Sequence, residues 1–550
     1  MIHALKNPAL FRSSSRPTSP APGVTSDSVF VNSGTATERP GRSLNKLTFS
    51  SFKRPATPVG TPAPTPAPAT LVQDGSYLEA LSLKLSEAVS KAILQPPAAA
   101  TATDQIAGKR PIPPGRGKAL CTLIVSELKA TRDNAHLYKA TLRSLQRPLS
   151  VLLNNLSTQL LPLLSSPTFL APPAPNVQAP NPNTTQLHAL AIAGFCGELL
   201  SGLDECGLGT DPSLKSVRDG LTSIIGRVSN PLVAGVKAEL MPLIEALETP
   251  ASSTVPKASV KAGPVLHPSI VSLQALMPIY SRAIARYTGS PSSQSTLATF
   301  LISVVWKALV ALSHRAKVQS PMTSPPSSPA LLPSGMKRNR RPSGNSPPAT
   351  PPASRFSLKL PPTSRPPSPP AVAMTSNVAA DARALYNLLH LLPRPPANSE
   401  ATAVAREAVD EAFSDLQALT VLLENTDSPF IFMNKTEEEV AADLEAWTAD
   451  LPTVIALPVL LRCKALSGGE GGGGAGAGGH QTPVTAASVA SMVGLAEEDY
   501  RRGCLSGFGR AEECGPIVTQ RVLEGLCAQA QAETRDVVSW LEGRLSAGEP

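Results

Sequence analysis

The sequence predicts an all-α protein, a helical bundle or irregular helical stack in two regions, with long disordered Pro/Ser-rich segments. Apolar residues recur at every third or fourth position over most of residues 76–317 and 377–545, which is the period of an α-helix. No run shows the sustained alternation of a β-strand. The chain has 58 prolines in 550 residues and only 4% aromatic residues, which argues against one large globular core.

The stretch Leu297–His314 is expected to be the central helix. Its apolar residues cover most of the helix circumference, so other helices have to pack around it. A membrane span needs about 20 mostly apolar residues, whereas this run is shorter and carries Lys307 near its middle. We therefore predict a buried core helix with His314 on the surface at its end, and we see no other membrane candidate.

The chain is expected to begin with a disordered basic tail, residues 1–75, rich in Pro, Ser and Thr. A basic all-helical domain is expected to follow at residues 76–317. Ser76 and Glu79 fit a capping box at the start of its first helix.

Prolines mark where the helices of this domain are expected to end or begin. Pro148 and the pair Asn230-Pro231 are expected to interrupt helices, and Asp211 followed by Pro212 is expected to start one. The helices predicted in this domain are Ser76–Leu94, Lys118–Leu145, Leu152–Leu164, Gln186–Asp204, Leu214–Val228, Val236–Leu247, Pro268–Tyr287 and Leu297–His314.

Residues 318–376 are expected to form a disordered basic linker. The segment contains 16 prolines and no Asp or Glu, and it has too few apolar residues to order itself. Its seven basic residues are Lys337, Arg338, Arg340, Arg341, Arg355, Lys359 and Arg365.

An acidic helical domain is expected at residues 377–466, followed by a Gly-rich tether at 467–482 and a C-terminal helical hairpin at 483–550. Thr436 and Glu439 form a second predicted capping box. The helices predicted here are Val378–Leu392, Ser399–Glu424, one that begins after Thr436, Leu457–Leu466, and two within 482–545.

The net charge of +8 hides an asymmetry between the two halves of the chain. Residues 1–376 hold 37 Lys and Arg against 16 Asp and Glu, a net charge of +21. Residues 377–550 hold 12 against 25, a net charge of −13. The first half is expected to attract anionic partners, and the acidic half is expected to cover the basic linker while the linker is unphosphorylated.

The densest basic motif is KRNRRPS, which spans Lys337–Ser343. Its four positive charges, Lys337, Arg338, Arg340 and Arg341, suit a nuclear-import receptor or a phosphate-rich surface. The two arginines before Ser343 also fit a basophilic kinase site. The alternative is a solvated patch that keeps the linker soluble.

Ser-Pro and Thr-Pro pairs, which suit proline-directed kinases, are abundant in both segments predicted to be disordered. Each phosphate adds about −1.5 to −2 charge, so roughly four or five would cancel the +7 of the linker. The alternative is that such pairs arise from composition alone. The candidate phosphorylation sites, which include the basophilic site Ser343, are Ser19, Thr57, Thr61, Thr65, Ser320, Ser324, Ser328, Ser343, Ser346, Thr350 and Ser368.

Pro111, Pro114 and Arg116 fit the PxxPx-basic pattern that aromatic-lined grooves bind. A stiff linker before a helix is the interpretation that we favour for this motif.

No catalytic or metal-binding pattern is apparent, so we expect no enzyme activity and no cofactor. The chain has no phosphate-binding glycine loop before Lys-Ser/Thr and no GxSxG motif, and its scattered histidines lack a partner at i+4. Cys196 is expected to be a small buried apolar residue. The seven cysteines form no CxxC pair, which suits a reducing compartment.

Together these features predict a non-enzymatic intracellular scaffold or adaptor, cytoplasmic or nuclear, whose helical faces bind other proteins and whose linkers are substrates of protein kinases. The alternative function is electrostatic binding of an anionic surface (nucleic acid, an acidic filament or a membrane) through the basic disordered segments. An integral membrane protein is not expected. The basic, acid-poor N-terminus keeps mitochondrial import as a less favoured location.

Overall fold

The computed structural model describes eleven ranges of the chain, and every structural statement below concerns these residues. By backbone contacts the chain divides into two units, residues 1–77 and 78–550, and the helices described below belong to the second apart from the first turns of α1. The described ranges are 70–97, 104–173, 182–250, 252–253, 266–315, 374–375, 377–397, 400–427, 435–467, 488–529 and 534–547.

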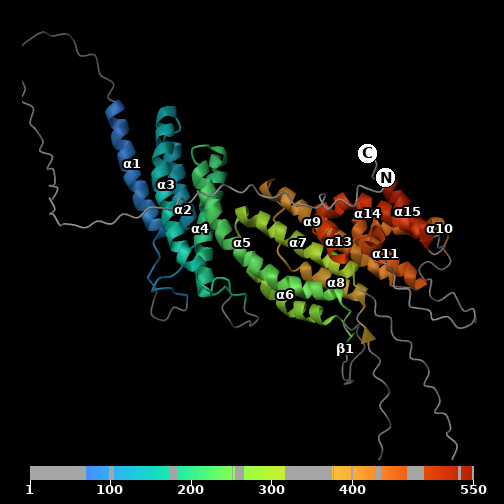
Figure 1. The fold of residues 1–550 in the computed structure, drawn as a ribbon. Coiled ribbons are helices and arrows are strands. Elements are labelled where there is room, and N and C mark those ends of the chain that lie inside the picture. Colours follow the sequence, from blue (N-terminus) through green and yellow to red (C-terminus); the bar gives the residue numbers. More distant parts are fainter. Residues whose placement is uncertain are drawn as a thin grey trace, which may run out of the picture. The chain divides into compact units, whose positions relative to one another are not determined.

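The described residues are almost entirely helical, which confirms the predicted all-α class (Figure 1). The helices before the predicted linker are α1 (Thr70–Ile93), α2 (Arg116–Ala130), α3 (Ala135–Leu164), α4 (Thr184–Glu205), α5 (Lys215–Glu245), α6 (Pro268–Tyr287) and α7 (Gln294–Ser313). Short 3-10 turns lie at η2 (Leu208–Thr210), η3 (Ala246–Glu248) and η4 (Pro291–Ser293).

Eight further helices follow the predicted linker. They are α8 (Val378–Leu389), α9 (Glu400–Thr426), α10 (Glu437–Thr448), α11 (Thr453–Ser467), α12 (Val489–Val493), α13 (Glu497–Cys504), α14 (Phe508–Gln529) and α15 (Arg535–Ala547). The only strands among the described residues are β1 (Ser252–Ser253) and β2 (Met374–Thr375), which pair antiparallel.

Helix α7 lies at the centre of the packing, as predicted. It contacts α5 on one side and α9, α8 and α11 on the others, so helices from both sides of the linker share its surface. Fourteen of its residues are buried, and Val304, Ala308, Leu309 and Leu312 have no exposed surface. Burying one such Val or Leu side chain contributes about 1.5–3 kcal/mol, so this helix anchors the core.

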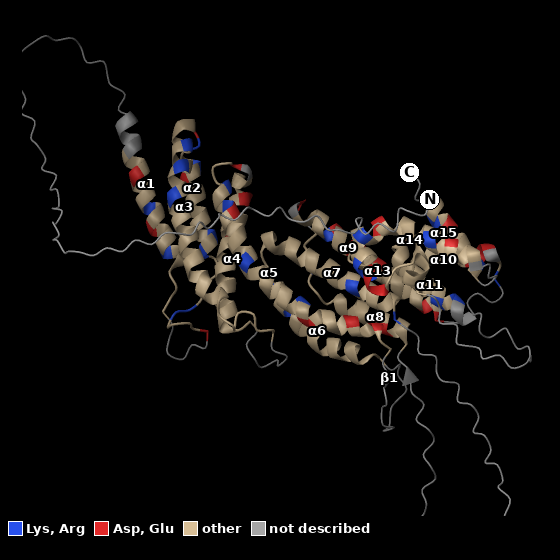
Figure 2. Cartoon of the chain, viewed as in Figure 1, with Lys and Arg blue, Asp and Glu red and all other residues tan. Residues whose placement is uncertain are grey.

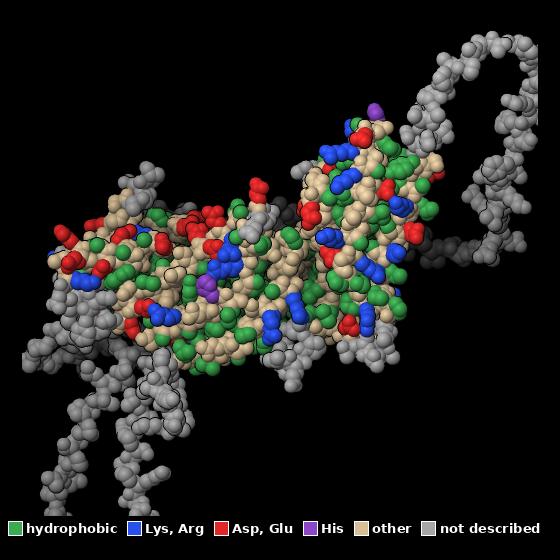
Figure 3. Space-filling view, turned by 180° about the vertical axis from the view of Figure 1, so that it is seen from behind, with side chains coloured by type: hydrophobic (Ala, Val, Ile, Leu, Met, Phe, Trp, Pro, Cys, Tyr) green, Lys and Arg blue, Asp and Glu red, His purple; other side chains and the backbone are tan. Residues whose placement is uncertain are grey.

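Contacts before and after α7 extend the stack. Helix α4 packs between α2 and α5, α3 contacts α4 and α5, and α6 packs on α5 and α8. At the other end α14 contacts α11, α12, α13 and α15. The predicted division into a basic and an acidic domain stays a prediction. Acidic side chains do gather over the C-terminal helices, at the left in the reverse view of Figure 3.

The prediction that Pro148 breaks a helix is wrong. Helix α3 begins after its N-cap residue Asn134 and runs through Pro148 to Leu164. The expected helix Lys118–Leu145 is instead broken earlier, between α2 and α3. A proline inside a helix costs about 3 kcal/mol, but buried leucines on both sides of Pro148 share one face of α3, and burying several of them exceeds that cost.

Asn230-Pro231 does not interrupt its helix either, because α5 runs from Lys215 to Glu245 without a break. Val228, Leu232 and Val236, which flank the proline, are buried and hold α5 against its neighbours. The start predicted at Asp211-Pro212 is an Asx turn just before α5, in which the Asp211 carboxylate accepts a hydrogen bond from the Ser213 N–H at 2.8 Å.

Local capping signals had mixed success. The box at Thr436 and Glu439 is confirmed, with both reciprocal hydrogen bonds present. The box at Ser76 is wrong, because α1 begins at Thr70 and places Ser76 inside the helix. The predicted C-terminal hairpin consists of four helices, α12–α15, and the Gly-rich tether lies almost wholly outside the described residues.

Two helices among the described residues are long and apolar enough to cross a membrane, one more than the sequence analysis recognised. They are Thr184–Glu205 and Pro291–Ser313, and 61% and 67% of their most apolar windows are buried inside the protein. Buried core helices pass the same test of length and composition, so the two are weak evidence for a membrane protein.

Candidate functional site

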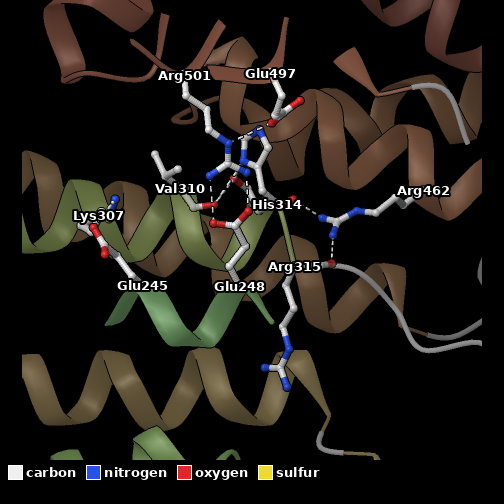
Figure 4. A network of polar contacts seen from close by, with 10 residues as sticks. Glu245, Glu248, Lys307, Val310, His314, Arg315, Arg462, Glu497 and Arg501 are labelled. Carbon is white, nitrogen blue, oxygen red and sulfur yellow. Dashed lines mark hydrogen bonds and ion pairs between the residues drawn. The ribbon is translucent and has the colours of Figure 1, made fainter. Parts of the chain in front are cut away.

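A cluster of polar and charged side chains surrounds the C-terminus of α7. Figure 4 shows side chains from η3, α11 and α13 that converge on the last turn of α7. A helix end leaves four backbone carbonyls without partners inside the helix, so a buried end needs donors from elsewhere. We call this cluster the α7 junction. It comprises Glu248, His267, Ser313, His314, Arg315, Asp381, Arg462, Glu497, Tyr500 and Arg501.

A fully buried ion pair forms the base of the α7 junction. The Arg315 guanidinium donates to the Asp381 carboxylate at 2.5 Å, and the two side chains are 1% and 0% exposed. The second oxygen of Asp381 accepts the backbone N–H of His267 at 2.8 Å. Asp381 therefore ties the end of α7 to the starts of α6 and α8, and it neutralises a charge that water cannot reach.

Arg462 of α11 supplies the donors that the end of α7 lacks. Its guanidinium donates to the backbone carbonyls of Ser313 and Arg315. Burial lowers the pKa of Arg462 to about 10, which leaves the group charged at neutral pH. A cation at a helix C-terminus also interacts favourably with the helix dipole.

Arg501 of α13 bridges two acidic residues at the upper side of the α7 junction (Figure 4). It donates to both carboxylate oxygens of Glu248, one at 2.9 Å, and to Glu497 at 2.9 Å. The hydrogen bonds to Glu248 are the main cause that raises the pKa of Arg501. These groups are about one-third exposed, so solvent weakens each ion pair, but the two-pronged geometry fixes α13 against η3.

His314 is not the surface residue that the sequence predicted. Its Nδ1 lies 3.1 Å from the Val310 carbonyl and 3.0 Å from the Ser313 hydroxyl, while its Nε2 is buried with no hydrogen-bond partner among the described residues. Burial, chiefly, lowers the pKa of His314 to about 4. The ring of Tyr500, whose hydroxyl is also buried without such a partner, lies 6.5 Å away.

The α7 junction has little room for a ligand. A pocket beside its residues Arg315 and Arg462 has a volume of about 20 Å³, which is space for a single water molecule. Its charged groups are paired with each other or with backbone carbonyls. The arrangement is therefore suited to holding elements together.

Larger pockets lie elsewhere among the described residues. One of about 440 Å³ lies between α4 and the end of α6, and one of about 330 Å³ adjoins it across Ser290 and Pro291. A third, of about 860 Å³, lies beside α14 and α15. Their volumes fit small ligands, but they contain none of the residues that the sequence singled out.

Most of the predicted site residues lie outside the described residues. This holds for the basic motif Lys337, Arg338, Arg340 and Arg341 and for every candidate phosphorylation site from Ser19 to Ser368. The structure therefore leaves these assignments as predictions. The described chain stops at Arg315 and resumes at residue 374, on either side of the linker.

The proline motif is described, and it forms a joint between helices. Arg116 donates to the backbone carbonyls of Lys91 and Leu94, at 2.9 and 2.5 Å, and so caps the end of α1. The Glu198 carboxylate accepts the N–H groups of Gly115 and Gly117 at 2.7 and 2.9 Å. With its basic residue engaged in this way, the geometry favours the linker interpretation of Pro111 and Pro114.

Histidine and cysteine side chains form no site in the described part of the chain. No group of three His, Cys, Asp or Glu residues there is arranged to hold a metal ion. Cys196 is buried, as predicted, and burial raises the pKa of its thiol to about 12. Cys504 and Cys514 are neighbours with free thiols, and burial likewise raises the pKa of Cys504 to about 12.

The sequence analysis missed the α7 junction because its members are single charges far apart in the chain. One local signal was available. Arg462 interrupts the apolar run Leu457–Leu466, and Asp381 follows Val378-Ala-Ala at a helix start. A lone charge on the apolar face of a predicted helix is expected to have a buried partner.

Comparison of the chain with models of protein families, with curated proteins and with solved structures gives no match. No family is assigned, and the arguments for function rest on the residues themselves.

Proposed function

We propose that this protein is a non-enzymatic intracellular scaffold or adaptor, in which helical surfaces bind partner proteins and phosphorylation of the linker 318–376 regulates that binding. The α7 junction carries the proposal, because it fixes Arg315 just before the linker to Asp381 in α8, the helix that follows the linker. Arg315, the last described residue before the linker, is fixed by Asp381 and by Arg462. A loop that leaves and returns at one rigid place is suited to carry regulatory charge next to a folded surface.

The returning end of the linker is held by several contacts. Met374 and Thr375 pair with Ser253 and Ser252. The Asn377 side chain caps α8 through the Ala379 and Ala380 N–H groups and donates to Asp427 at 2.7 Å. These contacts support the idea that the linker can change its charge without loosening the helices beside it.

Exposed apolar side chains on the helices support the protein-binding part of the proposal. Val404 of α9 is 78% exposed, Leu83 of α1 is 73% exposed and Leu161 of α3 is 67% exposed. Isolated exposed Val and Leu side chains also occur on proteins without partners, so these three mark the helix surfaces at which partner binding is tested.

The proposal is tested with three full-length forms of the chain. In the first, residues 318–372 are replaced by a flexible Gly/Ser linker of about a dozen residues, which is long enough to close the loop. The second carries Ala at the seven candidate Ser/Thr sites of the linker, and the third carries Val404→Asp as a helix-surface variant. Partners recovered from native extract are compared by quantitative mass spectrometry before and after treatment with a proline-directed kinase.

We expect the linker replacement to keep the same protein partners and the Ala form to lose their dependence on the kinase. The proposal is refuted if the purified chain shows a robust catalytic activity that point substitutions abolish. It also fails if the form with the replaced linker recovers no partner and if moderate salt releases every partner from the intact chain. That result would favour the alternative, in which the basic segments bind an anionic surface.

A further inference from the structure

Helix α3 presents a straight row of three basic side chains to solvent. Lys139, Arg143 and Arg147 follow each other at intervals of four residues and are all exposed. At 1.5 Å per residue, neighbouring side chains of the row start about 6 Å apart along the helix. We call these three residues the α3 basic row.

The charges of the α3 basic row are not neutralised by the described part of the protein. None of the three forms an ion pair with a described residue, and the 30 residues of α3 include no Asp or Glu. The blue segments of the ribbon in Figure 2 mark the Lys and Arg positions along α2 and α3. Basic residues of the C-terminal helices, by contrast, pair with acids, as in Arg383–Glu424, Arg394–Asp410, Lys464–Asp536, Arg510–Glu513 and Arg521–Glu524.

Neighbouring elements extend the positive surface. Gln146 donates to the Ser213 carbonyl at 3.1 Å, which places the exposed Lys215 at the start of α5 beside the α3 basic row. Lys129 and Arg132 are exposed near the α2–α3 corner. The acidic residues Asp133 and Asp219 are also exposed nearby, so the surface around the row is of mixed charge. The row itself contains positive charges alone.

We infer that the α3 basic row binds the sugar–phosphate backbone of a double-stranded nucleic acid without reading its sequence. A duplex offers a continuous, rigid array of phosphates, so three cations on one rigid helix can each find a partner in many registers. Contacts of this kind position a protein and carry no base specificity. The inference goes beyond the proposed scaffold function and does not depend on the linker.

A membrane surface fits the α3 basic row less well. An amphipathic helix binds a bilayer by inserting its apolar face. The apolar face of α3 is occupied in the core, where Leu145, Leu149, Leu152 and Leu156 are at most 1% exposed. The exposed part of α3 includes Val151 and Leu161, but these two do not form a continuous apolar face, and the basic row on that part suits an exposed polyanion.

Counterion release gives the expected magnitude. Each phosphate contact on a B-form duplex contributes about −0.9 to the slope of log K against log salt concentration. Loss of all three contacts would make the slope shallower by about 2.7. Between 50 and 200 mM salt, a slope of that size corresponds to an affinity change of about 40-fold.

The test measures binding of a fluorescein-labelled DNA duplex of about 20 base pairs to the full chain by anisotropy, over a series of KCl concentrations. The test variant is Lys139→Gln/Arg143→Gln/Arg147→Gln. The control variant removes three basic residues that have acidic partners and whose side chains are 36–66% exposed, Arg383→Gln/Arg510→Gln/Arg521→Gln. All variants are measured with the four basic residues of KRNRR also changed to Gln, so that the linker motif does not contribute.

We expect the row variant to lose about 2.7 units of slope and the control to change by less than one. Both variants should keep their helical circular dichroism, since exposed side chains contribute little to stability. The inference is overturned if the parent chain does not bind the duplex, if the row variant keeps the parent slope, or if the control loses as much. Equal binding of polyglutamate and duplex at 150 mM KCl would also overturn it, in favour of an acidic protein partner.

Discussion

Removing the charge of Asp381, with the shape of its side chain kept, should destabilise the α7 junction. The substitution Asp381→Asn keeps the side-chain volume and an oxygen that can accept the His267 N–H. It removes the anion that faces the Arg315 guanidinium at 2.5 Å. Because the two side chains are 1% and 0% exposed, water cannot replace the lost charge.

The expected cost follows from this burial. Breaking one partner of a buried ion pair typically destabilises a protein by about 3–5 kcal/mol. That range corresponds to about 150- to 5,000-fold in an opening equilibrium. An exposed ion pair contributes only about 0–1 kcal/mol. Arg383→Gln on the same helix, where Arg383 is 66% exposed and pairs with Glu424, is therefore the matched control.

Hydrogen exchange measured by mass spectrometry is the direct assay, supported by urea unfolding followed by circular dichroism. Amides at the end of α7 and at the starts of α6 and α8 should exchange about 150- to 5,000-fold faster in Asp381→Asn. Arg383→Gln should leave them unchanged. The double variant Arg315→Met/Asp381→Asn should recover most of the protection, since it removes both charges and keeps an acceptor for the His267 N–H. A free energy of unfolding for Asp381→Asn within about 0.5 kcal/mol of that of the parent protein would refute the reasoning.

Three further predictions concern stability. The pKa of His314 is about 4 in the folded chain against 6.5 when unfolded, so between these values only the unfolded chain takes up that proton. The contribution of neutral His314 to the free energy of unfolding should therefore be fully present above pH 6.5 and fall by up to about 3 kcal/mol toward pH 4. Urea titrations over this pH range should show a smaller decline for His314→Gln. Trp306→Phe removes the indole N–H that donates to the buried Leu505 carbonyl at 2.8 Å, and should cost about 1–3 kcal/mol with faster hydrogen exchange in α13; unchanged exchange would contradict this. Gly117→Ala places its Cβ 2.8 Å from the Glu198 side chain and should lower the free energy of unfolding measured in urea. Gly194→Ala on α4, which meets nothing within 4 Å, should raise that free energy by up to about 1 kcal/mol.

Sequence reasoning located the helices whose limits are set locally. The predicted helix Pro268–Tyr287 matches α6 at both ends. The box at Thr436 succeeded for the same reason, since the residues that cap α10 are three positions apart. The apolar circumference of α7 was sufficient to predict its burial, because no helix with so few polar positions is stable in water.

The predictions failed where distant packing outweighs a local rule. Pro148 carries a local cost, but the leucines that offset it are buried against α4 and α5, which follow later in the chain. The α7 junction has the same origin. Arg315 meets Asp381 across 66 residues and Arg501 meets Glu248 across 253, and no spacing rule connects residues so far apart.

The central place of α7 also has a consequence during synthesis. The indole of Trp306 donates to a carbonyl 199 residues further along the chain, at Leu505. At translation rates of about 5–20 residues per second, the ribosome needs roughly 10–40 s to deliver that partner. During this interval the apolar helix α7 has been synthesised, but some of the helices that pack against it have not, so part of its apolar surface is exposed. Chaperones that bind apolar segments therefore have a long and predictable opportunity to act on this protein, and α7 is the segment that they should protect.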